Sequence, residues 1–452
     1  MNDPPLVQYA CRSDEGMRRA ANQDSLVVRM CREDAEWHTC GHLFVMADGM
    51  GGHAVGDLAS RIAVDSLPIA YFKLDAPAVR ERLIGAMQAA NKAIGDKARE
   101  NPEFTDMGTT CSALSLSSSG AMVGHVGDSR VYRIRGTEIQ QLTFDHSLQW
   151  EMIRAGRATI ENVDMLHPRN VITRCLGPDS DVMIDVEGPF HVQAGDRFLL
   201  CSDGLTNHVD DSEIGAVVNS MPPTDAARLL IHLANLRGGS DNVSVIVVNV
   251  ERYPEIPTPV VDPPAAKTNP SLPKIPAVVG SGRSRTSEYS LVVFSFLATL
   301  GLAGIAFGQQ ALGLSLVCVA VILGFIRLIV SAGRSGELKN PSAGLPVSEL
   351  SGLTLSESSL PAAKSPYRRA GAEVPRLLIE HLAEMQSQLT QAAHANGWKV
   401  DRDALADLQR QAIAAVKQDQ LPQCVRLRAQ AIEMLMKDYY LLYRNQQQAR
   451  RT

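Results

Sequence analysis

The chain has 452 residues, a formal net charge of −5 and a sequence pI near 6.1. This length fits about two to four domains, and the acidic balance gives no support for a nucleic-acid partner, which usually presents a basic patch. The eight cysteines are scattered along the chain, as is typical of a reducing compartment rather than of a disulfide framework.

Five segments of different composition follow one another. Residues 1–251 contain short apolar runs broken by Gly, Asp and Ser, as in a globular domain. We predict a proline-rich linker at 252–288, an apolar pair of helices at 289–332, and a second linker, rich in Ser, Gly and Pro, at 333–372. Residues 373–452 show the apolar spacing of helices.

The first segment combines strand-like and helix-like patterns. Short apolar runs bounded by turn residues predict strands at 6–12, 24–30, 42–47, 109–117, 121–127, 130–135, 182–186, 197–202 and 243–250. Apolar residues at helical spacing predict helices at 54–67, 75–98 and 222–236. Many strands with few helices between them favour an α+β fold, in which helices cover antiparallel sheets.

Acidic residues stand at the ends of five predicted strands, beside Gly, Ser or Asn. They are Asp24, Asp48, Asp128, Asp203 and Asp241. In the stretch FVMADGMGGH a buried strand ends at Asp48, and a buried carboxylate is costly without a positive partner. Oxygen ligands of this kind are what Mg²⁺ and Mn²⁺ prefer. If the strand ends meet, they can hold two cations that activate a shared water and clamp a phosphoryl oxygen.

Other interpretations of these motifs stay open at this point. An Asp between a strand and a Gly, such as Asp48, is often only a turn residue or a helix cap. Residues 49–54 also have the G-x-G-x-x-A spacing of a dinucleotide site, but a second helix rather than a parallel strand follows the first. Two Cys and two His within 31–42 suggest a zinc site, although a hairpin loop between strands explains this segment better.

The apolar segment divides into two pieces, 289–308 and 311–332, each of which has roughly the length of a membrane-spanning helix. The alternative is a buried helical hairpin of a soluble domain, which all-round apolarity makes less favourable. The only charged residue inside is Arg327, which lies near one end. Basic residues flank the pair on both sides, namely Arg283, Arg285, Arg334 and Lys339. The positive-inside rule then predicts a transmembrane helical hairpin with both flanks in the cytoplasm.

Eight short motifs occur in the order found in one enzyme family. They are RAANQDS (19–25), ADGMGGH (47–53), GTT (108–110), HVGDSR (125–130), LTFDHS (142–147), TRCLG (173–177), SDGL (202–205) and DNVS (241–244). With these motifs, residues 6–251 resemble the metal-dependent serine/threonine protein phosphatases of type 2C, the PPM family, in their bacterial form. The resemblance implies an antiparallel β-sandwich flanked by α-helices, with residues 145–177 as its flap segment.

The resemblance also implies roles for the acidic residues. Asp48 is expected to bridge two Mn²⁺ or Mg²⁺ ions, one of which the carbonyl of Gly49 also binds. Asp203 and Asp241 are expected to complete the other ion's ligands. Asp128 resembles the acid that holds a third, weaker ion together with Asp203.

Two further residues and the reaction follow from the same resemblance. Arg19 resembles the arginine that grips the phosphate, since its fork suits two phosphate oxygens, and Asp24 resembles a residue that binds a metal through water. The implied reaction is hydrolysis of phosphoserine and phosphothreonine in proteins by a metal-bound hydroxide, on substrates of a Ser/Thr kinase. Gln23 stands where the family often has Glu, so the alternative is a catalytically weak, phosphoprotein-binding regulator. Together with the hairpin, this places the protein at the bacterial inner membrane, facing the cytoplasm.

The carboxy-terminal segment reads as a small all-α domain. Apolar faces predict helices at 374–392 and 421–446, and Asp401 is expected to cap a helix between them. Such a bundle can pack only on itself, or it can bind a protein partner.

Overall fold

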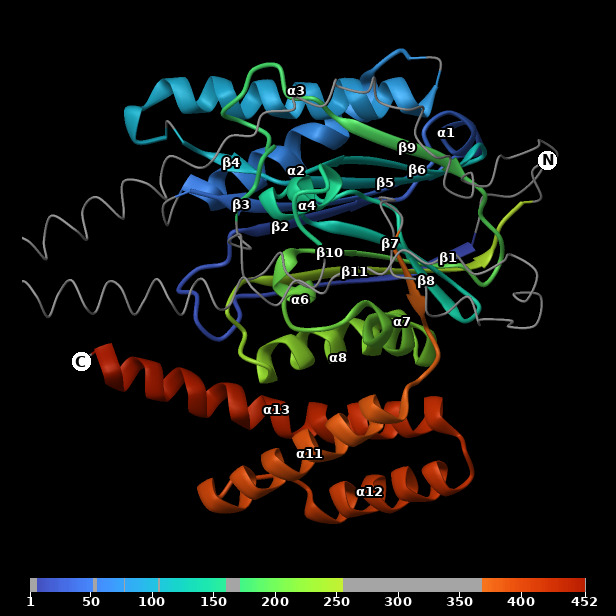
Figure 1. Ribbon diagram of the computed structural model, residues 1–452, viewed down its shortest axis with the longest axis vertical. Helices are drawn as coiled ribbons and strands as arrows, with labels where there is room; N and C mark the ends of the chain where they lie inside the picture. Colours follow the sequence, from blue (N-terminus) through green and yellow to red (C-terminus); the bar gives the residue numbers. More distant parts are fainter. Residues whose placement is uncertain are drawn as a thin grey trace, which may run out of the picture. The chain divides into compact units, whose positions relative to one another are not determined.

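The computed structural model describes residues 6–51, 55–76, 78–104, 106–159, 171–254 and 368–451 (Figure 1). The described residues all belong to one compact unit. The apolar pair predicted at 289–332, and nearly all of both predicted linkers, lie outside the described residues. Among the described helices, none combines the length and the apolar composition needed to cross a membrane.

Two antiparallel sheets form the centre of the compact unit. One sheet has the strand order β1 (Leu6–Asp14), β11 (Val243–Arg252), β10 (Arg197–Cys201), β7 (Arg130–Arg135), β8 (Glu138–Gln141) and β12 (Arg369–Gly371). The other has the order β2 (Asp24–Arg29), β3 (His42–Met50), β5 (Cys111–Ser117), β6 (Gly120–Val126) and β9 (Asp185–Phe190), and β4 (Gly108–Thr109) pairs with the end of β3. The predicted strands are therefore confirmed, although β9 begins later and ends later than expected.

The two sheets pack face to face, because alternate side chains of each strand point inward. Phe198 and Leu200 of β10 enter the core between the sheets, where they join Phe44 of β3 and Leu114 of β5. Leu199, which lies between them in the sequence, belongs to a different core on the outer face. The α+β sandwich expected from the sequence is thus present.

Helices cover both outer faces of the sandwich (Figure 1). The first face is covered by α2 (Val55–Lys73) and α3 (Val79–Glu100), whose apolar side chains form one core with β3, β5 and β6. The second is covered by α7 (Asp211–Ser220) and α8 (Pro223–Leu236). Shorter elements complete the domain, namely α1 (Asp34–Thr39), η1 (Pro102–Phe104), α4 (Leu148–Arg154) and α6 (Asp203–Thr206).

The segment 31–42 differs from the predicted hairpin loop, because it contains helix α1. Trp37 of this helix is 1% exposed. Its ring packs edge-on against Tyr253 at a centroid distance of 5.6 Å. Burial of one large aromatic side chain explains why a polar-looking stretch folds as a helical turn.

The carboxy-terminal segment forms three helices, α11 (Arg376–Asn396), α12 (Arg402–Lys417) and α13 (Leu421–Arg451). The side chain of Asp401 accepts a hydrogen bond from the Ala404 N–H at 3.0 Å, so the predicted cap is confirmed. These helices belong to the same compact unit as the sandwich, and their apolar side chains continue the core beneath α7 and α8. The short strand β12 ties their start to the edge of the sheet.

Candidate metal-binding active site

Two of the predicted acids face each other across neighbouring strands. Asp24 begins β2 and lies directly opposite Asp48 near the end of β3. Asp24 is 8% exposed; its Oδ2 accepts a hydrogen bond from the Ser202 hydroxyl at 2.9 Å, whereas its Oδ1 is buried without a partner among the described residues. An orphaned carboxylate oxygen in such a position requires a positive charge or a water.

The sheet that contains β10 and β11 brings Asp203 and Asp241 to the same place. Asp203 begins α6 directly after β10, and Asp241 precedes β11, its neighbour in the sheet. A Cβ atom at Gly204 would lie 2.0 Å from the carbonyl oxygen of Asn242, so only glycine lets these segments approach. The side chain of Asn242 accepts a hydrogen bond from the Gln23 N–H at 2.9 Å. This bond joins the end of the sheet that contains β11 to the start of β2 in the other sheet.

Gly49 occupies an equally tight position. A Cβ atom there would lie 2.0 Å from the carbonyl oxygen of Gly56 in α2. The Gly49 N–H donates to the carbonyl of Gln23 at 3.1 Å. Glycine is therefore required where the end of β3 passes close to α2.

The acids perturb one another strongly. Burial, and then the carboxylates of Asp24, Asp203, Asp128 and Asp241, raise the pKa of Asp48 well above its ordinary value. Burial, and then Asp128, Asp241 and Asp24, do the same to the pKa of Asp203. Burial is also the main reason why the pKa of Asp24 rises to about 6. Asp48 and Asp203 each lie near enough to several other acids for those charges to raise their pKa values.

Arg19 reaches the same site from the loop between β1 and β2. Its Nη2 donates to Asp241 Oδ2 at 2.7 Å, and its side chain is 47% exposed. That hydrogen bond is the main cause of a raised Arg19 pKa, to which the charges of Asp203 and Asp48 add. The backbone N–H groups of Met17 and Arg18 anchor the loop on the carbonyl of Gly239. The guanidinium thus lies at the rim of the acidic cluster with half its surface in solvent.

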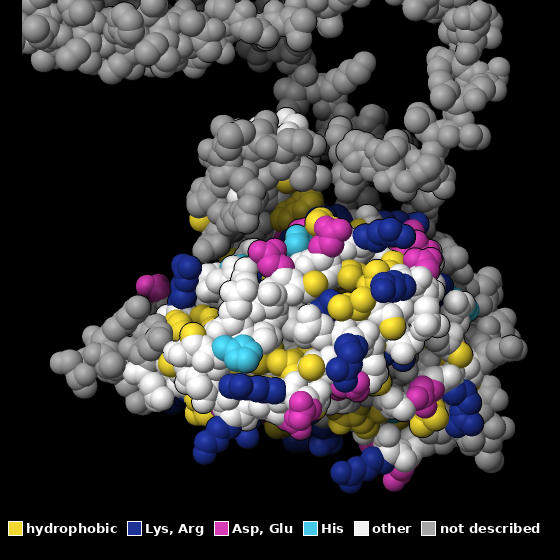
Figure 2. Space-filling view, turned by 90° about the horizontal axis from the view of Figure 1, so that it is seen from below, with side chains coloured by type: hydrophobic (Ala, Val, Ile, Leu, Met, Phe, Trp, Pro, Cys, Tyr) yellow, Lys and Arg dark blue, Asp and Glu magenta, His cyan; other side chains and the backbone are white. Residues whose placement is uncertain are grey.

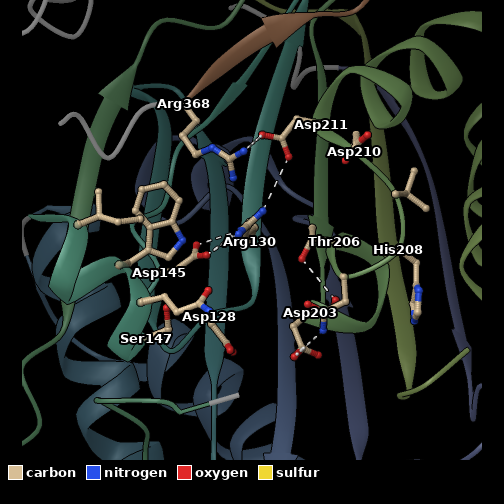
Figure 3. A pocket seen from close by; sticks show the side chains of 15 residues that line it. Asp128, Arg130, Asp145, Ser147, Asp203, Thr206, His208, Asp210, Asp211 and Arg368 are labelled. Atoms are coloured by element: carbon tan, nitrogen blue, oxygen red, sulfur yellow. Dashed lines mark hydrogen bonds and ion pairs between the residues drawn. The ribbon is translucent and has the colours of Figure 1, made fainter. Parts of the chain in front are cut away.

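Asp128 lies beside a cavity of about 430 Å³ that also takes in Asp203 (Figure 3). It follows Gly127, whose φ of +114° few other residues adopt. Burial, and then Asp145, raise the pKa of Asp128 to about 7. The structure therefore brings all five predicted acids together with Arg19.

The donor set fits divalent cations. Across the described ranges, no three His, Cys, Asp or Glu side chains are grouped closely enough to form a metal site from side chains alone. Mg²⁺ and similar cations keep several waters and accept backbone carbonyls as ligands, so a protein-only cage is not needed. The unpartnered oxygen of Asp24 and the mutual repulsion of the acids are both relieved by bound cations.

Comparisons with known proteins agree with this site. A sequence model of the family described as protein phosphatase 2C matches residues 17–230. The protein phosphatase PhpP of Streptococcus pneumoniae is 35% identical over 248 residues, which are 54% of this chain and 98% of that protein. The chain belongs to the protein phosphatase 2C family. Its sandwich domain is a protein-serine/threonine phosphatase.

Other relatives differ in how much of them is matched. The serine/threonine protein phosphatase PstP of Mycobacterium tuberculosis is 35% identical over 251 residues, or 55% of this chain and 46% of that protein. A crystal structure of PstP has a TM-score of 0.48 at 34% identity and covers 54% of this chain and 99% of its own. A structure of the PstP catalytic domain in complex with two manganese ions has a TM-score of 0.46 at 33% identity, with coverages of 54% and 98%.

The phosphatase site contains side chains to which the sequence motifs gave no role. Arg130 lies in the cavity wall between Asp145 and Asp211 (Figure 3), with Nη2 2.6 Å from Asp145 Oδ2. Arg368 pairs with Asp211 at 3.2 Å and lies over the ring of Trp150. Arg130 lies in the motif HVGDSR and Asp145 lies in the motif LTFDHS, so the sequence motifs could have indicated this pair. No sequence motif indicated Arg368, because more than one hundred residues separate it from the rest of the domain.

A histidine of the flap segment has a structural role. His146 is fully buried; its Nε2 lies 2.9 Å from Asp185 Oδ2, and its Nδ1 accepts the Gly127 N–H at 3.1 Å. The other oxygen of Asp185 accepts from Arg174 at 2.9 Å. This cluster holds the described part of the flap against β9 and leaves no ring nitrogen of His146 for catalysis. Residues 160–170 of the flap lie outside the described residues.

The zinc site considered for residues 31–42 is not supported. Cys31 Sγ lies 3.0 Å from His42 Nδ1, and burial raises the pKa of that thiol to about 11. A metal-bound cysteine requires a thiolate, which a raised pKa opposes. Within the described part of the chain, these residues do not form a group of metal ligands.

Proposed function

We propose that this phosphatase hydrolyses phosphoserine and phosphothreonine in proteins with two Mn²⁺ or Mg²⁺ ions. Asp48 and the Gly49 carbonyl would hold one ion, and Asp48, Asp203 and Asp241 the other. The convergence of these acids from two sheets around the unpartnered Asp24 oxygen is the observation that carries the proposal. When bound, such cations lower the pKa of a water and polarise a phosphoryl oxygen.

The protein's own side chains have separable tasks in this reaction. Arg19 is anchored through Asp241, and because its side chain is half exposed the remaining N–H groups can bind two phosphate oxygens. Asp24 has one oxygen fixed by Ser202 and one free to accept from a water in the metal's shell. Asp128, which lines the same cavity as Asp203, would hold a third, weaker ion with it.

One observation favours the alternative of a catalytically weak, phosphoprotein-binding protein. The Nε2 of Gln23 is buried and has no hydrogen-bond partner among the described residues. Only the Oε1 of a glutamine can accept from a metal-bound water, and it carries no negative charge, so this position offers the cations less than Glu would. Gln23→Glu is expected to increase Mn²⁺ affinity if this nitrogen faces the metal shell.

A membrane anchor at residues 289–332 is part of the proposal. The described chain leaves the phosphatase unit after Pro254 and re-enters it at Arg368, within the same compact unit. If the intervening segment enters a membrane, both of its ends would therefore lie on the same side of that membrane, as an even number of crossings requires. Together with the basic flanks, this supports a bacterial inner-membrane protein whose phosphatase faces the cytoplasm.

The substrates are proposed to be phosphoproteins made by a Ser/Thr kinase, and α11–α13 are proposed to be a surface that binds a partner protein. Viewed from the side of these helices, apolar side chains are interspersed with Lys, Arg, Asp and Glu (Figure 2). Exposed apolar residues on them include Leu377, Ile413 and Val416. Singly scattered residues of this kind are ordinary on a protein surface, so they give only weak support to a partner site.

The test uses the full-length protein in detergent and a phosphothreonine peptide. Mn²⁺-dependent hydrolysis is expected, with loss in chelator and in Asp203→Asn. Asp65→Asn, an exposed aspartate of α2, is the matched control and should keep activity. Calorimetric Mn²⁺ binding separates loss of metal from loss of chemistry. Equal activity of Asp203→Asn and Asp65→Asn would refute the proposed metal site.

A further inference from the structure

The last helix, α13, is fixed against the phosphatase by a chain of hydrogen bonds. His232 of α8 lies with Nε2 2.6 Å from Glu433 Oε2 and Nδ1 3.1 Å from the Tyr440 hydroxyl. The bond from His232 lowers the pKa of Glu433. An N–H at Nε2 and a lone pair at Nδ1 satisfy both contacts, because Tyr440 can then donate to Nδ1.

This hydrogen-bond chain continues into the loop that carries Arg19. The Nδ2 of Asn235 donates both to the Tyr440 hydroxyl and to Asp14 Oδ1, each at 2.9 Å. The same Asp14 oxygen accepts the Gly16 N–H at 2.9 Å. Tyr440 therefore acts on the start of the Arg19 loop through one asparagine.

A cavity of about 470 Å³ lies between α13 and this loop. Residues 13–20 and Asn22 line it on one side, and Tyr440, Tyr443 and Arg444 line it on the other. Arg19 itself is in the wall, so the cavity adjoins the predicted phosphate-binding position. The match to the family model ends at residue 230, which means that α13 is an addition outside the matched family domain.

The charged groups of this cavity are unequally engaged. Asp14 accepts two hydrogen bonds and Arg19 is paired with Asp241. The exposed guanidinium groups of Arg18 and Arg444 line the cavity and have no ion pair with any described residue, and Glu15 is the only other lining carboxylate. The cavity wall therefore contains two positive side chains without an ion pair among the described residues, Arg18 and Arg444, and one such negative side chain, Glu15.

We propose that this cavity is a substrate subsite for an anionic side chain near the phosphorylated residue, with Arg444 of α13 and Arg18 as its ligands. The proposal rests on the proposed function, since Arg19 would hold the phosphate that is removed. Arg18 and Arg19 are consecutive, and an extended peptide advances about 3.3–3.6 Å per residue, so the anionic group lies within a few residues of the reacting one. A carboxylate and a second phosphate share the required chemistry, because the arginine fork binds either.

The test compares three phosphothreonine peptides with the full-length protein and Mn²⁺. Their flanking residues are neutral, acidic, or contain a second phosphoserine. We expect the KM of the two anionic peptides to be lower than that of the neutral peptide by about fivefold, the upper range for an exposed ion pair. Arg444→Gln should bring this ratio close to one, whereas Lys437→Gln, an exposed change on α13 outside the cavity, should keep it.

The KM ratios of the three peptides test the subsite in the following way. A ratio that responds to Arg444→Gln for only one peptide identifies the group recognised, a carboxylate or a phosphate. Equal KM values for all three peptides, or equal effects of Arg444→Gln and Lys437→Gln, overturn the subsite. If no peptide is hydrolysed, the proposed function fails instead, and the same ratio measured as Kd by fluorescence anisotropy still tests the subsite.

Discussion

The pair of Arg130 and Asp145 gives the sharpest energetic prediction. Arg130 Nε lies 3.0 and 2.9 Å from the two oxygens of Asp145, and its Nη2 lies 2.6 Å from Oδ2. The side chains are 14% and 4% exposed. Burial opposes the charge of Arg130, but Asp145, Tyr132 and Asp211 outweigh it, and the pKa of Arg130 is raised. The charge of Arg130 is therefore not lost by titration at ordinary pH.

Arg130→Met leaves the Asp145 carboxylate buried without its cation, which costs about 3–5 kcal/mol of unfolding free energy. Asp145→Leu leaves the cation with Asp211 at 3.8 Å and should cost a comparable amount. The double variant replaces the pair with apolar side chains and should recover to within about 1 kcal/mol of the wild type, because the desolvation penalty disappears with the charges.

The measurement is chemical unfolding of the four proteins in chelator, so that bound metal adds no stability. The expected coupling energy is about 3 kcal/mol or more. Additive effects of the two single variants, or single effects below about 1 kcal/mol, would show that the pair is not desolvated as its exposure indicates.

Three further predictions concern other parts of the molecule. Burial raises the pKa of Asp185, but a histidine and an arginine outweigh burial and lower this pKa to about 2. The stabilising effect of the Asp185 carboxylate is complete above the ordinary pKa of 3.8 and is lost as pH falls toward 2. The difference in unfolding free energy between wild type and Asp185→Asn should therefore narrow from about pH 5 to about pH 3. Gly204→Ala should lower the melting temperature by several degrees and weaken Mn²⁺ binding, because its Cβ meets a carbonyl at 2.0 Å, whereas Gly371→Ala, with open space around it, should change neither. Tyr440→Phe removes a hydroxyl that accepts an asparagine N–H and should cost about 1 kcal/mol in denaturant unfolding; an equal loss in Tyr439→Phe would contradict the role of that hydroxyl.

Much of the sandwich could be predicted because its strands are short apolar runs between turn residues. The stretch 130–135 was predicted with the observed bounds of β7, since glycine-marked turns bound it on both sides. Helix α1 was missed because one buried Trp, rather than a periodic apolar face, stabilises it. Helix α7 was missed because its buried face includes Gly215, whose Cβ would contact Ala372 from the carboxy-terminal segment at 2.8 Å.

The acidic site could be anticipated for a different reason. Acids at strand ends beside glycines are a local pattern, and antiparallel neighbours bring such ends together, as the pairing of Asp24 with Asp48 shows. Contacts between distant segments had no such pattern. The pairing of β12 with β8 and the approach of Tyr440 to Asn235 each join residues that are more than two hundred positions apart.

The return of the chain to its own sheet has a consequence for proteolysis. The Gln141 N–H donates to the carbonyl of Arg368 at 2.7 Å, and the Ala372 N–H donates to Thr137 at 2.7 Å, while α13 shares the apolar core of α7 and α8. A single cut between residues 255 and 367 therefore breaks the covalent chain but leaves the two fragments associated. Release of an intact phosphatase unit from the anchor proposed at 289–332 would need two cuts, one on each side of that anchor.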